Sequence, residues 1–158
     1  MNPELEPLAE MMEGVSNVMP NSFDGWYQGV LLRVLRAPLA IAIFAKMPVS
    51  FPASLQVVSR GRTLPYRENS ISDYARTGDR SFDEAFLIWT SDPTVALREL
   101  TIPVRLALLS LAEVCPNIRL QDDYFRAEFG VRDRAIDALP AVAQIARILR
   151  DTPRARTV

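Results

Sequence analysis

Residues 77–100 read TGDRSFDEAFLIWTSDPTVALREL and carry the clearest structural signals in the chain. Within this stretch EAFLIWT, residues 84–90, is rich in aromatic and β-branched residues, which is typical of a central strand. Asp92 and Pro93 follow, an aspartate that accepts hydrogen bonds as an N-cap and a proline that suits the first turn of a helix. The stretch therefore predicts a buried strand followed directly by a short helix over residues 93–100.

The acidic residues around the start of this strand allow two interpretations. Asp79, Asp83 and Glu84 supply the oxygen ligands that magnesium or calcium requires, and carboxylates also act as acid and base. Aspartate is equally common in turns, because its side chain hydrogen-bonds to the nearby backbone. We interpret Gly78 and Asp79 as a turn and the other two acids as solvated residues at the strand entrance, so no metal site is predicted.

Two further helices and a hairpin are predicted downstream. A helix that starts at a proline-containing turn is predicted over residues 102–114. Residues 118–129, IRLQDDYFRAEF, alternate on either side of an acidic turn and predict a hairpin. A final amphipathic helix is predicted from residue 133 to residue 149, in which Pro140 indicates either a regular start near Asp137 or a kink.

The segment before residue 77 is predicted to be mostly β. The dipeptides DG at residues 24–25 and QG at residues 28–29 are typical of turns. Residues 30–45 alternate on both sides of a central proline and predict a hairpin. Residues 55–60, LQVVSR, predict one more short strand. The polar, turn-rich residues 61–79 that follow form a stretch so long that it should hold short elements of its own or carry function.

These elements predict an α+β fold, in which a mainly antiparallel sheet packs against two or three helices, because strands outnumber helices and do not alternate with them. The chain has 158 residues, of which 49% are apolar and 23% charged, and this composition suits one soluble domain with its own core. We place that domain at residues 18–150, between an N-terminal segment over residues 1–17 and a basic tail over residues 151–158.

The N-terminal segment is predicted to be an interaction element. Two prolines near its start confine any helix to about residues 8–16. The apolar side chains predicted to make the contact are those of Leu8, Met11, Met12 and Val15. So short a helix docks on its own core, frays, or docks on a partner, and the sequence alone leaves these alternatives open. The working prediction is that residues 1–17 dock on another subunit or across a homodimer, with residues 48–76 near that contact.

The residue types present exclude much common chemistry. Histidine is absent and Cys115 is the single cysteine, so the chain lacks the usual nucleophile–base pairs and the ligands of zinc and iron–sulfur sites. It also has no glycine-rich phosphate-binding motif. We therefore expect no enzyme activity, no cofactor and no bound zinc, iron or copper.

Charge and hydropathy bear on location and partners. The formal net charge is −1, which provides no long-range field to steer the chain to nucleic acid or anionic membrane. No apolar run approaches the roughly 20 residues of a membrane helix. The single cysteine is compatible with a reducing compartment. We expect a cytoplasmic protein without a membrane span, with nucleic acid disfavoured as a partner.

One basic cluster offers an alternative role. Arg60, Arg62 and Arg67 lie close together with Tyr66 between them, in the polar region that follows the strand at residues 55–60. Arginine recognises carboxylates and phosphates through its planar fork of N–H groups. This cluster predicts, as the alternative hypothesis, a module that binds a small molecule or an anion.

The sequence also resembles a broad group of uncharacterised bacterial proteins, known as domain-of-unknown-function families, over about residues 23–149. The resemblance is carried by a Thr-Gly-Asp, a Phe-Asp-x-x-Phe and an Asp-Pro at similar spacing, here Thr77, Gly78, Asp79, Phe82, Asp83, Phe86, Asp92 and Pro93. It implies a shared fold and no particular activity. Together these observations favour a non-enzymatic protein-interaction or accessory subunit of a bacterial assembly, with a protein partner or a second copy of itself.

Overall fold

One antiparallel sheet organises the molecule. The computed structural model describes residues 1–46, 55–60, 74–121, 123–130 and 134–151. In this part of the chain nine strands form a single sheet in the order β1-β2-β3-β4-β9-β8-β5-β7-β6, and all neighbours are antiparallel. The strands are β1 Glu13–Met19, β2 Ser22–Tyr27, β3 Val30–Ala37, β4 Ala40–Lys46, β5 Gln56–Ser59, β6 Tyr74–Ala75, β7 Phe86–Trp89, β8 Asn117–Gln121 and β9 Tyr124–Gly130.

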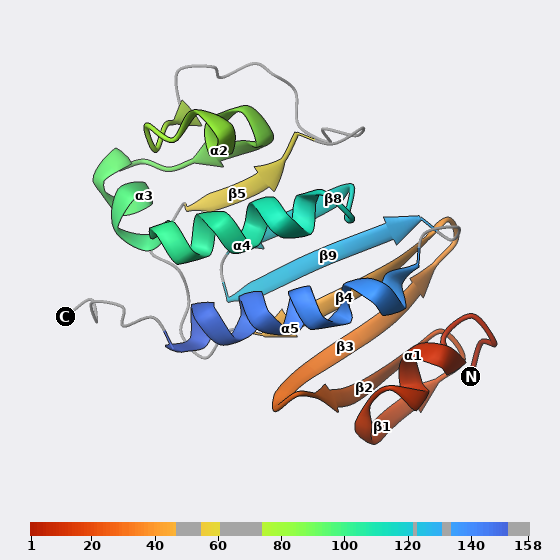
Figure 1. The fold of residues 1–158 in the computed structure, drawn as a ribbon. Helices are drawn as coiled ribbons and strands as arrows, with labels where there is room; N and C mark the ends of the chain where they lie inside the picture. The colour runs from red at the N-terminus through yellow and green to blue at the C-terminus, as the bar shows by residue number, and fades with distance from the viewer. Residues whose placement is uncertain (47–54, 61–73, 122, 131–133, 152–158) are drawn as a thin grey trace.

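The helices gather on one side of this sheet (Figure 1). They are α1 Glu6–Glu10, α2 Arg80–Ala85, α3 Pro93–Glu99, α4 Ile102–Ala112 and α5 Ala135–Asp151. The two longest, α4 and α5, pack against each other, and α5 also contacts β3 and β9. The predicted class, α+β with a mainly antiparallel sheet, is therefore confirmed, with α4 and α5 as the main covering helices.

The core lies between the sheet and these helices. Alternate residues of β3, β8 and β9 point to this inner face, as the side-chain period of two requires. Val34, Ile43, Ala127 and Ile118 follow one another across β3, β4, β9 and β8, and each is almost fully buried. The residues between them point to the opposite face, which we call the outer face.

The N-terminal segment differs from its prediction. A helix over residues 8–16 is wrong, because α1 ends at Glu10 and the chain then enters β1. The predicted boundary between residues 17 and 18 falls inside this strand. Gly14 has a φ of +58°, a conformation that glycine adopts without strain, and this residue lies at the start of the strand rather than inside a helix.

The four apolar residues assigned to this segment therefore do not share one face. Leu8 and Met12 are buried in the core, whereas Met11 and Val15 are exposed. Leu5, which also recurs in the helical spacing, is fully buried. Helix α1 contacts α5 and β1, so the segment packs against its own chain in this structure.

One of the two turns predicted near residue 25 is also wrong. Asp24 and Gly25 lie in the middle of β2. The Met12 side chain packs against Gly25 so closely that a Cβ at this position would lie 3.0 Å from it. Gln28 and Gly29 do form the turn between β2 and β3, with φ values of 47° and 78°. The glycine in β2 thus serves close packing rather than a turn.

One element departs from the sequence prediction downstream: helix α2 precedes β7 where a strand entrance was predicted. The short strand β6 lies within the polar stretch, where the sequence allows short elements, and the final helix is present as predicted. Helix α5 starts at Ala135 and runs through Pro140. The proline removes one backbone hydrogen bond near the helix start, and the buried face of α5, which includes Leu139, Val142 and Leu149, outweighs that loss.

The remaining predicted elements are confirmed. The hairpins β3–β4 and β8–β9, the short strand β5, and the helices α3 and α4 all lie where the sequence places them. Residues 152–158 of the predicted basic tail lie outside the described residues. Among the helices that the structure describes, none combines the length and the apolar character needed to cross a membrane.

Candidate interaction surface

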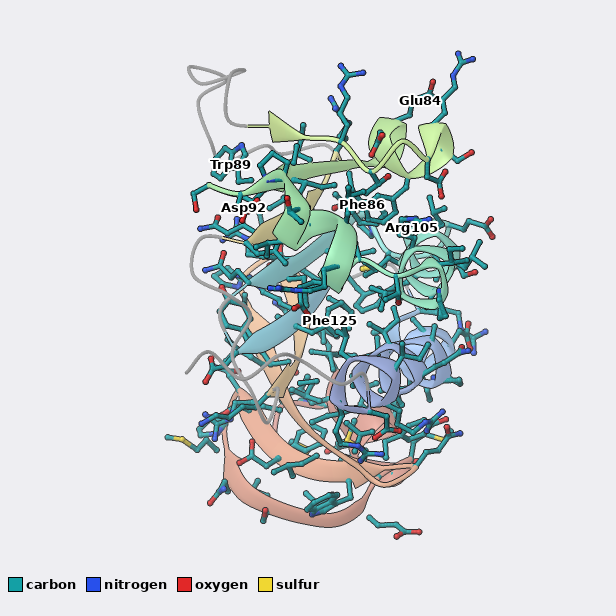
Figure 2. All side chains as sticks on the ribbon, turned by 90° about the vertical axis from the view of Figure 1, so that its left-hand side faces the viewer. Glu84, Phe86, Trp89, Asp92, Arg105 and Phe125 are labelled. Carbon is teal, nitrogen blue, oxygen red and sulfur yellow. The ribbon has the colours of Figure 1, made fainter. Side chains whose placement is uncertain are left out.

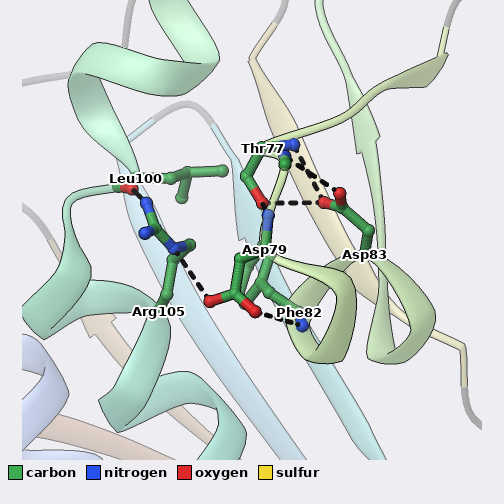
Figure 3. A network of polar contacts seen from close by, with 7 residues as sticks. Thr77, Asp79, Phe82, Asp83, Leu100 and Arg105 are labelled. Atoms are coloured by element: carbon green, nitrogen blue, oxygen red, sulfur yellow. Dashed lines mark hydrogen bonds and ion pairs between the residues drawn. The ribbon is translucent and has the colours of Figure 1, made fainter.

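Two acidic residues of the opening stretch, Asp79 and Asp83, form a network of contacts around the start of α2 (Figure 3). Asp79 is the N-cap of α2 and accepts a hydrogen bond from the Phe82 backbone N–H at 3.3 Å. Its other oxygen accepts from Nε of Arg105 at 3.3 Å, and Arg105 also donates to the carbonyl of Leu100 at 2.6 Å. Asp79 therefore joins α2 to α4 and to the end of α3.

The carboxylate of Asp83 binds the loop that precedes α2. It accepts hydrogen bonds from the backbone N–H groups of Thr77 and Gly78 at 2.9 and 3.1 Å, and from the Thr77 hydroxyl at 2.8 Å. The solvated role predicted for Asp83 is therefore wrong, since its oxygens hold the loop ahead of α2. Glu84 is exposed and pairs with Arg80, as a solvated residue would.

These contacts show that the stretch is structural. Asp92 caps α3 by accepting from the Thr94 backbone N–H at 2.9 Å, as predicted. Within the described ranges no group of three or more acidic or cysteine residues is arranged to hold a metal ion. The Thr77–Leu100 stretch thus positions a strand and three helices.

Of the three arginines in the basic cluster, Arg60 lies within the described residues. Arg60 directly follows β5, is exposed, and donates its backbone N–H to the carbonyl of Ala85 at 2.9 Å. Arg62 and Arg67 lie outside the described residues.

A different group of residues stands out on the outer face. Met19, Trp26, Leu31 and Leu35 are exposed there, and we call these four residues the outer patch. Trp26 pairs directly with Leu31 across β2 and β3, and each is 48% exposed. Ser22 joins the other two, because it pairs with Met19 on one side and with Leu35 on the other. The patch therefore extends across β1, β2 and β3.

The outer patch surrounds an ordered ion pair. Asp24 accepts from Nε and an NH2 group of Arg33 at 2.7 and 3.0 Å, and from the Asn17 amide at 2.7 Å. Asp24 is only 8% exposed, while most of the Arg33 side chain is open to solvent. The hydrogen bonds from Arg33 hold the pKa of Asp24 below its ordinary value. The hydrogen bonds to Asp24 therefore link β1, β2 and β3 on the outer face.

The lowered pKa of Asp24 predicts a specific dependence on pH. Its contribution to stability is fully present above the unfolded-state pKa, about 4, and is lost as the pH falls through the lower folded-state value. Asp24→Asn is therefore expected to destabilise the protein at pH 7 and to lose most of that effect at low pH. Urea denaturation of both proteins across the acid range measures this. A difference in stability that stays constant with pH would contradict the role of Asp24.

A second set of exposed apolar side chains lies on the helical side of the molecule. Ile102 and Leu106 of α4 are more than half exposed, and Leu97 of α3 and Val114 after α4 are also exposed. Ile102 and Leu106 lie one helical turn apart, so they share a face of α4.

Comparison with known proteins supports the fold alone. No protein-family model matches the sequence, and no curated protein matches it. Among solved structures, the chain is similar to the crystal structure of the mycobacterial trehalose monomycolate transport factor A, TtfA. The TM-score is 0.59 at 12% sequence identity, and the match covers 99% of this chain and 88% of TtfA. The two chains therefore share an α+β architecture over nearly their whole length.

Proposed function

We propose that this protein is a non-enzymatic interaction subunit of a bacterial assembly, and that it binds a protein partner through the outer patch. The observation that carries the proposal is the exposed Trp26–Leu31 pair on the outer face of the sheet. Two large apolar side chains at directly opposed positions bury part of their surface against each other. Each of the two nevertheless remains nearly half exposed. Contiguous exposed apolar surface of this kind marks protein–protein contact sites.

The composition of the patch suits a protein partner. Tryptophan, methionine and arginine are enriched in protein interfaces, and tryptophan and arginine carry much of the binding energy. Trp26, Met19 and Arg33 lie together here. Asp24 already forms an ion pair with Arg33, so docking of a partner would not bury the charge of Arg33 without a counter-ion. The partner surface expected is apolar, with an acceptor group facing the exposed side of Arg33.

The chemistry of the chain is compatible with this role. Histidine is absent, and Asp79 and Asp92 of the opening stretch are engaged as helix caps. The similar structure TtfA is by its name a transport factor. That name describes TtfA, and we extend to this chain only the general proposal of an accessory role.

Leu31→Glu is expected to weaken partner binding strongly. A carboxylate in the middle of an apolar contact would be desolvated on docking, and loss of a central contact costs about 2 kcal/mol or more, which weakens binding roughly thirtyfold. The fold should be preserved because Leu31 lies on the solvent side of β3. The measurement is recovery of stoichiometric subunits with the tagged full chain at its native expression level, followed by titration of the identified subunit.

Leu39→Glu is the matched control, because Leu39 is 82% exposed in the turn between β3 and β4 and lies outside the patch. The control should bind as the wild type does. Light scattering over a range of concentrations tests the homodimer: a dimer that Leu31→Glu dissociates would identify a second copy as the partner. Equal binding by both variants would contradict the proposal.

A further inference from the structure

The turn between β2 and β3 connects the two strands that carry Trp26 and Leu31. Its two residues, Gln28 and Gly29, have φ values of 47° and 78°. Positive φ values at both residues of a two-residue hairpin turn are characteristic of type I′, which favours asparagine followed by glycine. Glycine adopts this conformation without strain, whereas the left-handed region is unfavourable for glutamine. The conformation of Gln28 therefore depends on other contacts that stabilise it.

The C-terminal part of α5 supplies these contacts. Arg147 donates from one terminal nitrogen to the backbone carbonyl of Gln28 at 3.2 Å and to the side-chain oxygen of the same residue at 3.1 Å. Arg150 donates to the carbonyl of Gly29 at 3.4 Å. We call these three hydrogen bonds the turn contacts. They bind both carbonyl groups of the turn to a helix that lies on the inner side of the sheet (Figure 1).

The strands on either side of the turn are anchored independently of these arginines. Tyr27 and Val30, which pair directly next to the turn, are both buried. Trp26 and Leu31 form the following pair and point to the outer face. The hairpin should therefore stay folded without the turn contacts. The twist and mobility of its end should change, because the conformation of a hairpin turn is matched to the twist of its strands.

We infer that Arg147 and Arg150 are positioning residues for the outer patch. By holding the β2–β3 turn, they keep the Trp26–Leu31 pair in the arrangement that a partner contacts. The inference rests on the proposed role of the outer patch and extends it, since it couples a helix on one face of the sheet to the contact surface on the other. Both arginines act through the turn and not through contact with the partner.

Fluorescence anisotropy of Trp26 in the free, full-length protein tests this coupling without a partner. In a Trp89→Phe background Trp26 is the single tryptophan. Arg147→Ala should lower the anisotropy of Trp26, because the loosened turn gives the end of the hairpin more freedom. Adding Gln28→Asn to this variant should restore the anisotropy, since asparagine followed by glycine adopts the type I′ turn by its own preference.

Arg134→Ala is the matched control, because Arg134 is an exposed arginine at the opposite end of α5, where it pairs with Asp137. It should leave the anisotropy unchanged. The affinity for the subunit that co-purifies with the tagged chain should fall about threefold to tenfold in Arg147→Ala, as expected for hydrogen bonds lost at an exposed site. Gln28→Asn should restore this affinity as well. Circular dichroism confirms that each variant is folded.

Unchanged anisotropy of Trp26 in Arg147→Ala, or a decrease that Gln28→Asn does not reverse, would overturn the inference. An affinity of Arg147→Ala equal to that of the wild type would overturn it too. Failure of the proposed function would give a different result: Leu31→Glu would bind the partner as the wild type does, while the effect of Arg147→Ala on the anisotropy would persist.

Discussion

Deletion of residues 1–17 is expected to unfold the protein, in contrast to the soluble core that the sequence alone predicts. The deletion removes α1 and most of β1, and with them the buried side chains of Leu5, Leu8 and Met12. Burial of each such side chain is worth about 1.5–3 kcal/mol. Together they approach the whole stability of an ordinary domain, about 5–15 kcal/mol. The loss also removes most of the strand that pairs with β2.

Thermal unfolding followed by circular dichroism measures this effect, and two point variants make it specific. Leu8→Ala should cost about 2–5 kcal/mol because Leu8 is buried, whereas Met11→Ala should change stability by about 0.5 kcal/mol or less because Met11 is exposed. A truncated protein that melts cooperatively near the wild-type temperature would show that residues 1–17 are a separate docking arm.

Phe82→Ala is expected to have the second large effect, a loss of about 3–5 kcal/mol. Phe82 of α2 is fully buried and stacks on Phe86 of β7, with ring centres 4.7 Å apart. The labelled Phe86 in Figure 2 marks where this short helix meets the sheet. Because α2 is only six residues long, its own backbone hydrogen bonds stabilise it little, so the aromatic stack is needed in addition to the Asp79 cap and its contact with Arg105.

Glu84→Ala is the control for this prediction, since Glu84 lies in the same helix with an exposed side chain. Its loss should change stability by about 0.5 kcal/mol or less. Chemical denaturation of both variants gives the comparison. If Phe82→Ala were no more destabilising than Glu84→Ala, α2 would be a surface loop and the strand-entrance interpretation of the sequence would be correct.

Much of the fold follows from local signals in the sequence. Asp92 and Pro93 define the start of α3, and the alternation on each side of Pro38 defines the β3–β4 hairpin. The sequence predictions are wrong where tertiary contacts determine the local structure. Gly25 is compatible with a turn or with a strand, and only the approach of Met12 selects the strand. The chain before residue 17 has helical spacing, yet pairing with β2 makes most of its second half a strand.

The candidate site was harder to predict than the fold. Val30 to Leu35 are apolar except for Arg33, so the sequence indicates an apolar residue on each face of β3 without showing which face remains open. Trp26 looks like a core aromatic residue until the register places it opposite Leu31 on the outer face. Arg119 and Arg126 lie seven residues apart in the sequence, and the β8–β9 hairpin places them directly opposite each other.

The fluorescence of Trp26 tests the proposed interaction surface most directly. In a Trp89→Phe background Trp26 is the single tryptophan, and it is half exposed in the free protein. Titration with the co-purified subunit, or an increase in protein concentration if the partner is a second copy, should shift its emission to shorter wavelength and saturate at a stoichiometric amount. Binding that is seen by light scattering but leaves the emission of Trp26 unchanged would contradict the assignment of the outer patch as the contact surface.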